Sequence, residues 1–174
     1  MSTTPDQITA TVRVHHGSPT KGRPTAAACY VAVFSDGRGF FGVGHAREQM
    51  PPICWAVQKV LQVAPPEIDL ILHTPTELGN YIAIPDGYAR KPKAYEKSAW
   101  GIIKPTMDQI DHRMALRPDA LRLVYFGKKD KPPLLAPSNV ALGKARDLAG
   151  KTYWDQTTIS VEFGLFAEHE IGLA

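Results

Sequence analysis

The sequence predicts an α/β protein in which a five-stranded mixed sheet, with its first three strands antiparallel, is flanked by helices. Apolar runs of strand length and apolar positions at helical spacing follow one another as three strands, helix, strand, helices, strand, helix. A length of 174 residues with 44% apolar residues suits one domain with a sizeable core. We expect this domain to span residues 1–150 and a C-terminal extension to span residues 151–174.

The first three strands are predicted by apolar runs and one tight turn. Thr9–His15 alternates between apolar and polar residues, which places its valines on one face. Ala26–Phe34 is a continuous apolar run, and Phe40–Val43 resumes after the turn sequence Asp36-Gly37. Because such a turn joins neighbouring antiparallel strands, the second and third strands are expected to form a hairpin.

The first long helix and the fourth strand follow. A helix is predicted to begin at Pro51-Pro52, because a proline in the first helical turn gives up no hydrogen bond. Pro65-Pro66 end it, and Ile68–Leu72 is an apolar run typical of a strand buried on both faces. The buried face of the helix is predicted from apolar residues at helical spacing: Ile53, Trp55, Ala56, Val57, Val60 and Leu61.

The remaining elements of the domain are two helices, a strand and a last helix. A short helix is expected over Glu77–Ile82, and a longer one from near Pro105, where apolar residues recur at helical spacing. Leu121–Phe126 predicts the fifth strand. Ser138 or Asn139 can cap the last helix, which we expect to run through Ala149 and to be closed by Gly150.

The extension carries one more strand pattern, over Thr157–Phe166. We expect this strand to pack on its own domain. The alternative is that it adds an edge strand to the sheet of a partner, which makes the extension the predicted contact with another protein.

Composition excludes several classes of protein. No apolar run approaches the roughly 18 residues of a membrane span, and the polar start Met1–Gln7 does not resemble a signal peptide. Cys29 and Cys54 lie in apolar runs without metal-ligand spacing, as buried thiols in a reducing compartment do. We therefore expect a cytoplasmic protein with no membrane contact, no metal and no cofactor.

Charge is unevenly distributed along the chain. The tail from Thr152 holds four of the 17 acidic residues and no Lys or Arg, so residues 1–151 carry 20 basic and 13 acidic side chains. A net charge of +7 on this part favours a polyanionic partner.

Three short strings occupy the expected element boundaries. They are His15-His16-Gly17-Ser18 after the first strand, Gln49-Met50-Pro51-Pro52 at the first long helix, and His73-Thr74-Pro75-Thr76-Glu77 after the fourth strand. The positions of these strings, together with the order of elements between about Thr9 and Gly150, make the chain resemble the type I ribonuclease H family. That family carries an acidic residue at the position of each of the three strings and a fourth in its last helix. The matching positions here are His16, Gln49, Pro75 and Gly143, or Arg146 in another register.

The resemblance implies the fold of an enzyme that lacks the catalytic acidic residues. Two-metal phosphodiester hydrolysis holds a pair of Mg²⁺ ions with carboxylate ligands, and none of the four positions supplies one. We therefore expect the nuclease activity to be lost. A divergent metal-dependent enzyme is an alternative, with His16 and His73 joined by His15 or His45 around a transition metal.

A basic, aromatic segment corresponds to the part of the family that grips the nucleic-acid backbone. Cations match phosphates and aromatic rings stack on bases, so this segment predicts backbone binding. Two further groups follow the first and last strands and can border the same groove. The predicted nucleic-acid-binding residues are Arg90, Lys91, Lys93, Tyr95, Lys97 and Trp100, with Lys21 and Arg23, and Lys128 and Lys129.

The sequence thus predicts a catalytically inactive, ribonuclease H-like accessory protein that binds nucleic acid within a larger nucleoprotein assembly. The contacts are expected to be to the backbone, with RNA-containing duplexes or hybrids among the candidate ligands. Two alternatives stay open: a protein–protein interaction scaffold without nucleic-acid contact, and a divergent metal-dependent nuclease.

Overall fold

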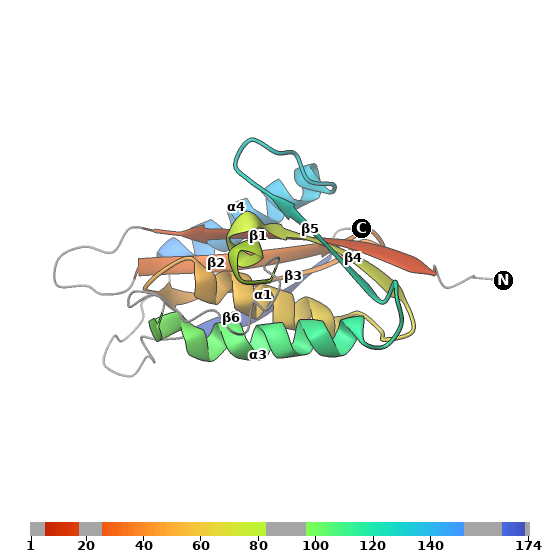
Figure 1. Cartoon of the computed structure of the whole chain (residues 1–174). Helices are drawn as coiled ribbons and strands as arrows, with labels where there is room; N and C mark the ends of the chain where they lie inside the picture. Colours follow the sequence, from red (N-terminus) through yellow and green to blue (C-terminus); the bar gives the residue numbers. More distant parts are fainter. Residues whose placement is uncertain (1–5, 18–25, 83–96, 152–164, 173–174) are drawn as a thin grey trace.

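One mixed β-sheet organises the computed structural model, which describes residues 6–17, 26–82, 97–151 and 165–172 (Figure 1). The strand order across the sheet is β5-β4-β1-β2-β3-β6. β1, β2 and β3 are antiparallel neighbours, whereas β4 pairs parallel with β1, and β5 parallel with β4. The strands are β1 (Gln7–His16), β2 (Ala26–Phe34), β3 (Arg38–Ala46), β4 (Asp69–Pro75), β5 (Leu121–Phe126) and β6 (Leu165–Gly172).

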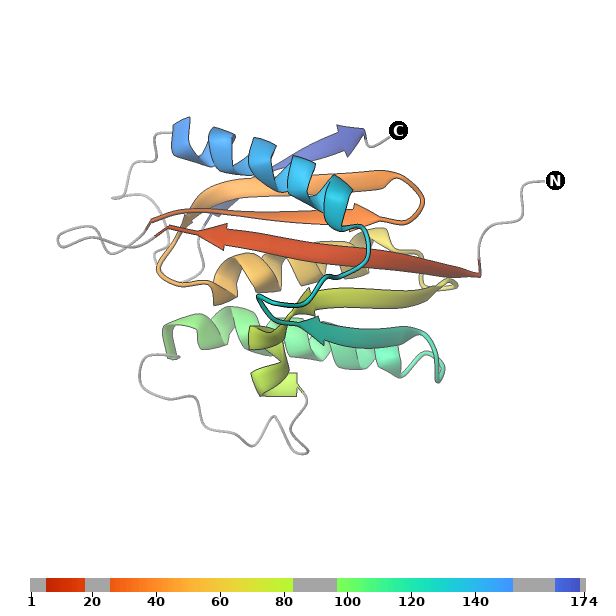
Figure 2. The same cartoon turned by 90° about the horizontal axis from the view of Figure 1, so that it is seen from above.

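Helices cover the two faces of this sheet unequally (Figure 2). On one face, α1 and α3 pack with β1, β2 and β4 around the larger apolar core. On the other face, α4 is the one described helix that lies over β1, β2 and β3. The helices are α1 (Met50–Val63), α2 (Thr76–Ile82), α3 (Lys97–Met114) and α4 (Leu135–Lys151). The predicted α/β class, with three antiparallel strands followed by parallel ones and flanking helices, is confirmed.

Side-chain alternation in β2 builds both cores. Tyr30, Ala32 and Phe34 point into the larger core, while the residues between them contact α4. Because nearly every residue of β2 is buried, this strand reads as a continuous apolar run, as strands covered on both faces do.

The C-terminal strand differs from its predicted position. The sequence predicts a strand over Thr157–Phe166, of which residues 157–164 lie outside the described residues. β6 begins at Leu165 and pairs antiparallel with β3, from His45↔Leu165 to Arg38↔Gly172. The sheet is therefore six-stranded, and the extension supplies one of its edges.

Two predicted helix starts are wrong. α3 begins at Lys97 and contains Pro105 in its interior, because Ile102 and Ile103 pack into the core and extend the apolar face beyond the proline. α4 begins at Leu135, before the predicted caps. Its Ser138 hydroxyl instead donates to the carbonyl of Leu135 (2.8 Å). Pro51-Pro52 do occupy the first turn of α1, as predicted.

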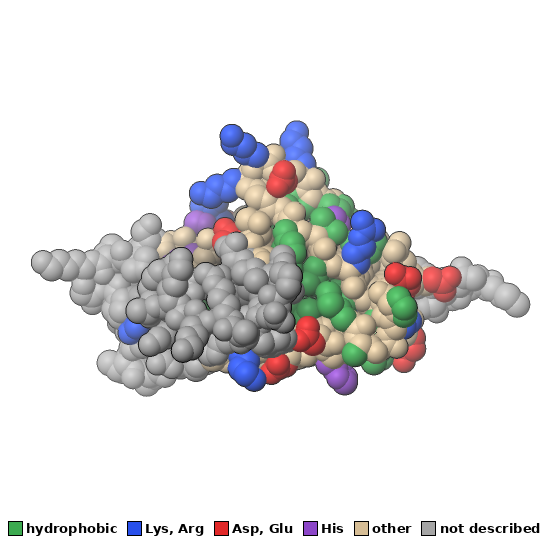
Figure 3. All heavy atoms as spheres, viewed as in Figure 1, with side chains coloured by type: hydrophobic (Ala, Val, Ile, Leu, Met, Phe, Trp, Pro, Cys, Tyr) green, Lys and Arg blue, Asp and Glu red, His purple; other side chains and the backbone are tan. Residues whose placement is uncertain are grey.

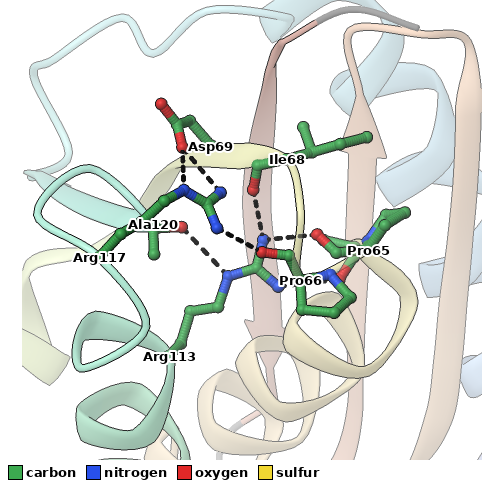
Figure 4. Close-up of polar contacts among 8 residues, drawn as sticks. Pro65, Pro66, Ile68, Asp69, Arg113, Arg117 and Ala120 are labelled. Carbon is green, nitrogen blue, oxygen red and sulfur yellow. Dashed lines mark hydrogen bonds and ion pairs between the residues drawn. The ribbon is translucent and has the colours of Figure 1, made fainter.

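A buried arginine joins the loops at one end of the larger core (Figure 4). Arg113 of α3 donates to the carbonyls of Ala64 (2.9 Å), Pro65 (2.9 Å), Ile68 (2.7 Å) and Ala120 (3.1 Å). These carbonyls lie after α1 and before β4 and β5, so one side chain satisfies acceptors from two loops.

Arg117 continues this network one turn along the chain. Its Nε donates to Oδ1 of Asp69 (2.8 Å), and one of its terminal nitrogens donates to the carbonyl of Pro66 (2.7 Å). Within the described parts of the chain, no helix is long and apolar enough to cross a membrane.

Candidate nucleic-acid interface

A groove opens where the parallel strands end. Since β1, β4 and β5 run in the same direction, their carboxyl ends meet at one edge of the sheet, the usual place for binding sites in α/β folds. The groove has a volume of about 440 Å³ and is lined by Arg13, Val14, Gln49, Pro75, Glu77, Phe126, Gly127, Lys128, Lys129, Asp130, Lys131, Pro132, Leu135 and Asn139.

The loop between β5 and α4 forms one wall of the groove. The buried hydroxyl of Thr11 donates to the carbonyl of Pro133 (2.7 Å) and fixes the loop to β1. Asp130 Oδ2 accepts from the backbone N–H of Gly127 (2.7 Å), which closes a tight turn. Leu134 then turns the chain into α4 with a φ of 59°, a conformation that costs a non-glycine residue about 1 kcal/mol. These contacts therefore fix the position of this loop relative to the sheet.

Basic side chains gather on this loop. Lys128, Lys129 and Lys131 are exposed and line the groove. Figure 3 shows Lys and Arg atoms over the loop that joins β5 to α4. With Arg13, the groove has four basic and two acidic side chains, Glu77 and Asp130, among its lining residues. Its electrostatic character is therefore that of an anion site.

Arg13 supplies the cation nearest to the sheet, and sequence reasoning missed it. Its NH1 group donates to Oδ1 of Asn139 and to Oγ of Ser138 (3.4 Å). Burial lowers the pKa of Arg13, but a guanidinium stays charged at neutral pH. The alternation of β1 contained the signal: with Val12 and Val14 on one face, Arg13 must lie on the other.

The four positions that match the family's acids are not brought together. Gln49 and Pro75 line the groove, whereas His16 and Gly143 are not among its lining residues. The strand register gives the reason for His16. Thr11 pairs with His73, so two residues further along both strands Arg13 is level with Pro75, and His16 lies beyond the end of β4.

His16 and Gly143 have other surroundings. The Nε2 atom of His16 lies 2.7 Å from the carbonyl of Ala46, which ties the end of β1 to the end of β3. Gly143 is exposed on α4, and a Cβ added there would meet nothing within 4 Å. One turn earlier on the same helix, Asn139 lines the groove. Arg13 and Asn139 thus line the groove, whereas His16 and Gly143 do not.

The described side chains of the groove offer no set of metal ligands. Among the residues that the structure describes, no group of three or more His, Cys, Asp or Glu side chains could hold a metal ion. Burial raises the pKa of Cys29 to about 11 and that of Cys54 to about 12, so neither thiol is a nucleophile at neutral pH.

The other predicted binding residues are placed only in part. Lys97 and Trp100 lie in the first turn of α3, on the sheet face opposite α4. The residues Lys21, Arg23, Arg90, Lys91, Lys93 and Tyr95 lie outside the described residues.

No protein-family model matches this chain, and no curated protein is significantly similar to it in sequence. The resemblance to ribonuclease H therefore stays a prediction, and the groove has to be understood from its own chemistry.

Proposed function

We propose that this protein is a cytoplasmic, catalytically inactive, ribonuclease H-like accessory protein that binds the backbone of nucleic acid in the groove, within a larger assembly. One observation carries the proposal: four basic side chains line the groove at the edge of the sheet where a nuclease of this family would hold its carboxylates. The observed order of elements is the one on which the resemblance rests.

The chemistry of these side chains suits phosphate. Lys128, Lys129 and Lys131 are exposed point charges on a loop that is already ordered, so little backbone freedom is lost when they meet an anion. Arg13 offers a planar guanidinium oriented by Ser138 and Asn139. Contacts of this kind position a backbone without reading its sequence, and they weaken steeply with salt.

The same side chains argue against catalysis. A pair of Mg²⁺ ions would need several carboxylates, but Arg13 places a positive charge level with Pro75, where such ions would have to lie. Gln49 offers a neutral amide and Pro75 no ligand at all. Among the described lining residues, Glu77 is the only carboxylate besides Asp130, whose oxygen already accepts from Gly127.

The decisive measurement is a titration of single-stranded, duplex and hybrid oligonucleotides at several salt concentrations, read by fluorescence anisotropy. We expect the Lys128→Ala/Lys129→Ala variant to bind every sequence more weakly. The salt slope, which is the fall of the logarithm of the binding constant with the logarithm of the salt concentration, should be less steep by about 1.5, as expected for the loss of two phosphate contacts. Lys144→Ala is the matched control, because Lys144 is exposed on α4 and outside the groove. Absence of binding by the unaltered protein even at low salt would refute the proposal.

Catalytic inactivity has its own test. Incubation of each substrate with Mg²⁺ or Mn²⁺ is expected to leave it intact. Cleavage that persists through purification and disappears in a His16→Ala or Glu77→Ala protein would instead establish the divergent metal-dependent nuclease.

A protein-interaction scaffold is the second candidate, and a specific surface favours it. A pocket of about 600 Å³ lies between the ends of α1 and α3. It is lined by the apolar residues Leu61, Ala64, Pro66 and Leu116, together with Gln62, Asp108, Gln109, His112 and Arg113. Leu116 is 45% exposed and lies beside the other apolar side chains of this pocket, and apolar surface gathered in one place, unlike a single exposed leucine, is typical of a protein contact. The scaffold function is supported if the titrations show no binding of nucleic acid and the protein co-purifies with a defined protein partner.

A further inference from the structure

One half of a sheet face lies under none of the helices that the structure describes. This half is formed by β4 and β5, on the side where α4 covers β1, β2 and β3, and of the described loops only the one from β5 to α4 crosses it (Figure 2). Alternation identifies the side chains on this face, because Leu70, Leu72 and Leu121 point into the opposite core. The uncovered face therefore consists of Ile71, His73, Arg122, Val124 and Phe126.

Phe126 connects this face to the groove. It is half-buried at the end of β5 and lines the groove together with Lys128 and Lys129, which follow it in the chain. A partly exposed aromatic ring among lysines presents a flat apolar surface next to cations. Ring faces and cations side by side are what single strands bind, because bases stack while phosphates pair with charge.

His73 adds a second flat group on the same face. Burial and the nearby Arg122 lower its pKa, so the imidazole is neutral at physiological pH and acts as a ring rather than as a charge. Arg122 itself is exposed on β5 and extends the basic character of the groove over the uncovered face.

We propose that the ligand of the groove is a single-stranded nucleic acid, with a base stacked on Phe126 and phosphates held by Arg13, Lys128 and Lys129. This inference rests on the proposed function and narrows its ligand. In a duplex the bases are paired and stacked on one another, so a ring beside the groove finds no free base face, and Phe126 would contribute nothing. An acidic peptide would match the cations but would leave the ring equally unused.

The test compares variants of Phe126 on two oligonucleotides of equal charge, one normal single strand and one in which abasic sites replace the bases. Because bases stack on aromatic side chains and not on leucine, Phe126→Leu should weaken binding of the normal strand about tenfold. It should leave the salt slope and the affinity for the abasic strand unchanged. Phe126→Tyr keeps the ring and should bind as the unaltered protein does. Phe41→Leu, which changes a half-buried ring on β3 away from the groove, is the matched control.

The outcomes separate this inference from the proposed function. If Lys128→Ala/Lys129→Ala loses binding but Phe126→Leu and Phe126→Tyr bind both strands like the unaltered protein, stacking is refuted and backbone binding stands. The single-strand proposal would also be overturned if the protein bound duplex more tightly than single strand, or if it bound polyglutamate as tightly as single strand. If no oligonucleotide binds at low salt, both proposals fail. Circular dichroism of each variant verifies folding. If Phe126→Leu does not fold, the unaltered protein still decides the question, because stacking requires it to bind the normal strand about tenfold more tightly than the abasic strand, and equal binding of the two strands would refute stacking.

Discussion

The ring of Tyr30 packs across the backbone of Gly42, its partner on the neighbouring strand. A Cβ added to Gly42 would lie 2.4 Å from two ring carbons of Tyr30, which is only 1% exposed and cannot move aside. The glycine is therefore required by close approach, since the larger core uses the space above it for the aromatic ring.

A pair of glycine substitutions tests this contact. Gly42→Ala should lower the free energy of unfolding by about 2 kcal/mol, as overpacking of a full core does. Gly143→Ala should raise it by about 0.5–1 kcal/mol, because Gly143 lies exposed inside α4 with open space around it. Urea unfolding measures both. Equal effects of the two substitutions would contradict the packing described for Tyr30.

Arg113 offers a second test at the scale of a residue. Arg113→Met keeps most of the apolar stem but leaves four carbonyls without their donor, so we expect a loss of about 3 kcal/mol in the free energy of unfolding. Arg122→Met, on the exposed side of β5, should change it by less than about 0.5 kcal/mol. A loss below 1 kcal/mol for Arg113→Met would mean that water replaces the guanidinium at little cost.

Elements were predictable where a local signal determines them. The apolar run of β2, the Asp36-Gly37 turn and the prolines of α1 each act within a few residues, and these elements form as predicted. The start of α3 was not predictable in this way. There, tertiary packing of Ile102 and Ile103 outweighs the local cost of Pro105.

The candidate site depended on register, which no short segment specifies. Gln49, Pro75, Lys128 and Lys129 were found from their places at element ends. Arg13 and Asn139 were missed because the pairing of β1 with β4 decides which residue of β1 is level with Pro75. A shift of register along a strand moves side chains to other neighbours, so a count of residues along one strand does not specify which of them faces the groove.

The contribution of β6 to the sheet can be tested by removing this strand. Removal of residues 152–174 would leave the edge of β3 without its antiparallel partner and expose a row of backbone donors and acceptors. We expect the shortened protein to unfold at lower temperature and to associate as its concentration rises. Thermal unfolding and light scattering measure these effects. A shortened protein that stays monomeric and equally stable would show that β6 contributes little to the sheet.

At the scale of the whole molecule, stability should depend on pH through its histidines. Burial lowers the pKa of His15, His45 and His73, and Arg146 and Arg122 lower those of His15 and His73 further. The unfolded chain therefore binds more protons as pH falls below about 6.5, the ordinary histidine pKa. The stability that neutral imidazoles contribute is complete above that pH and is lost as pH falls towards the folded-state values.

The measurement is urea unfolding at about pH 7.5 and about pH 5.5, and we expect lower stability at the acidic pH. A His73→Gln protein should lose less stability on acidification than the unaltered protein, since one of the three shifted groups is gone. An unchanged pH dependence in that variant would exclude His73 as a contributor.

The directions of the strands have a practical consequence for every binding experiment above. β6 is antiparallel to β3 and β3 runs with β1, so β6 ends at the end of the sheet where β1 begins. The groove opens at the other end, where β1, β4 and β5 finish. A protein attached to a sensor surface through either terminal strand, β1 or β6, is therefore held at the end of the sheet away from the groove, and the groove stays accessible. Immobilised protein should give the same affinities as protein free in solution.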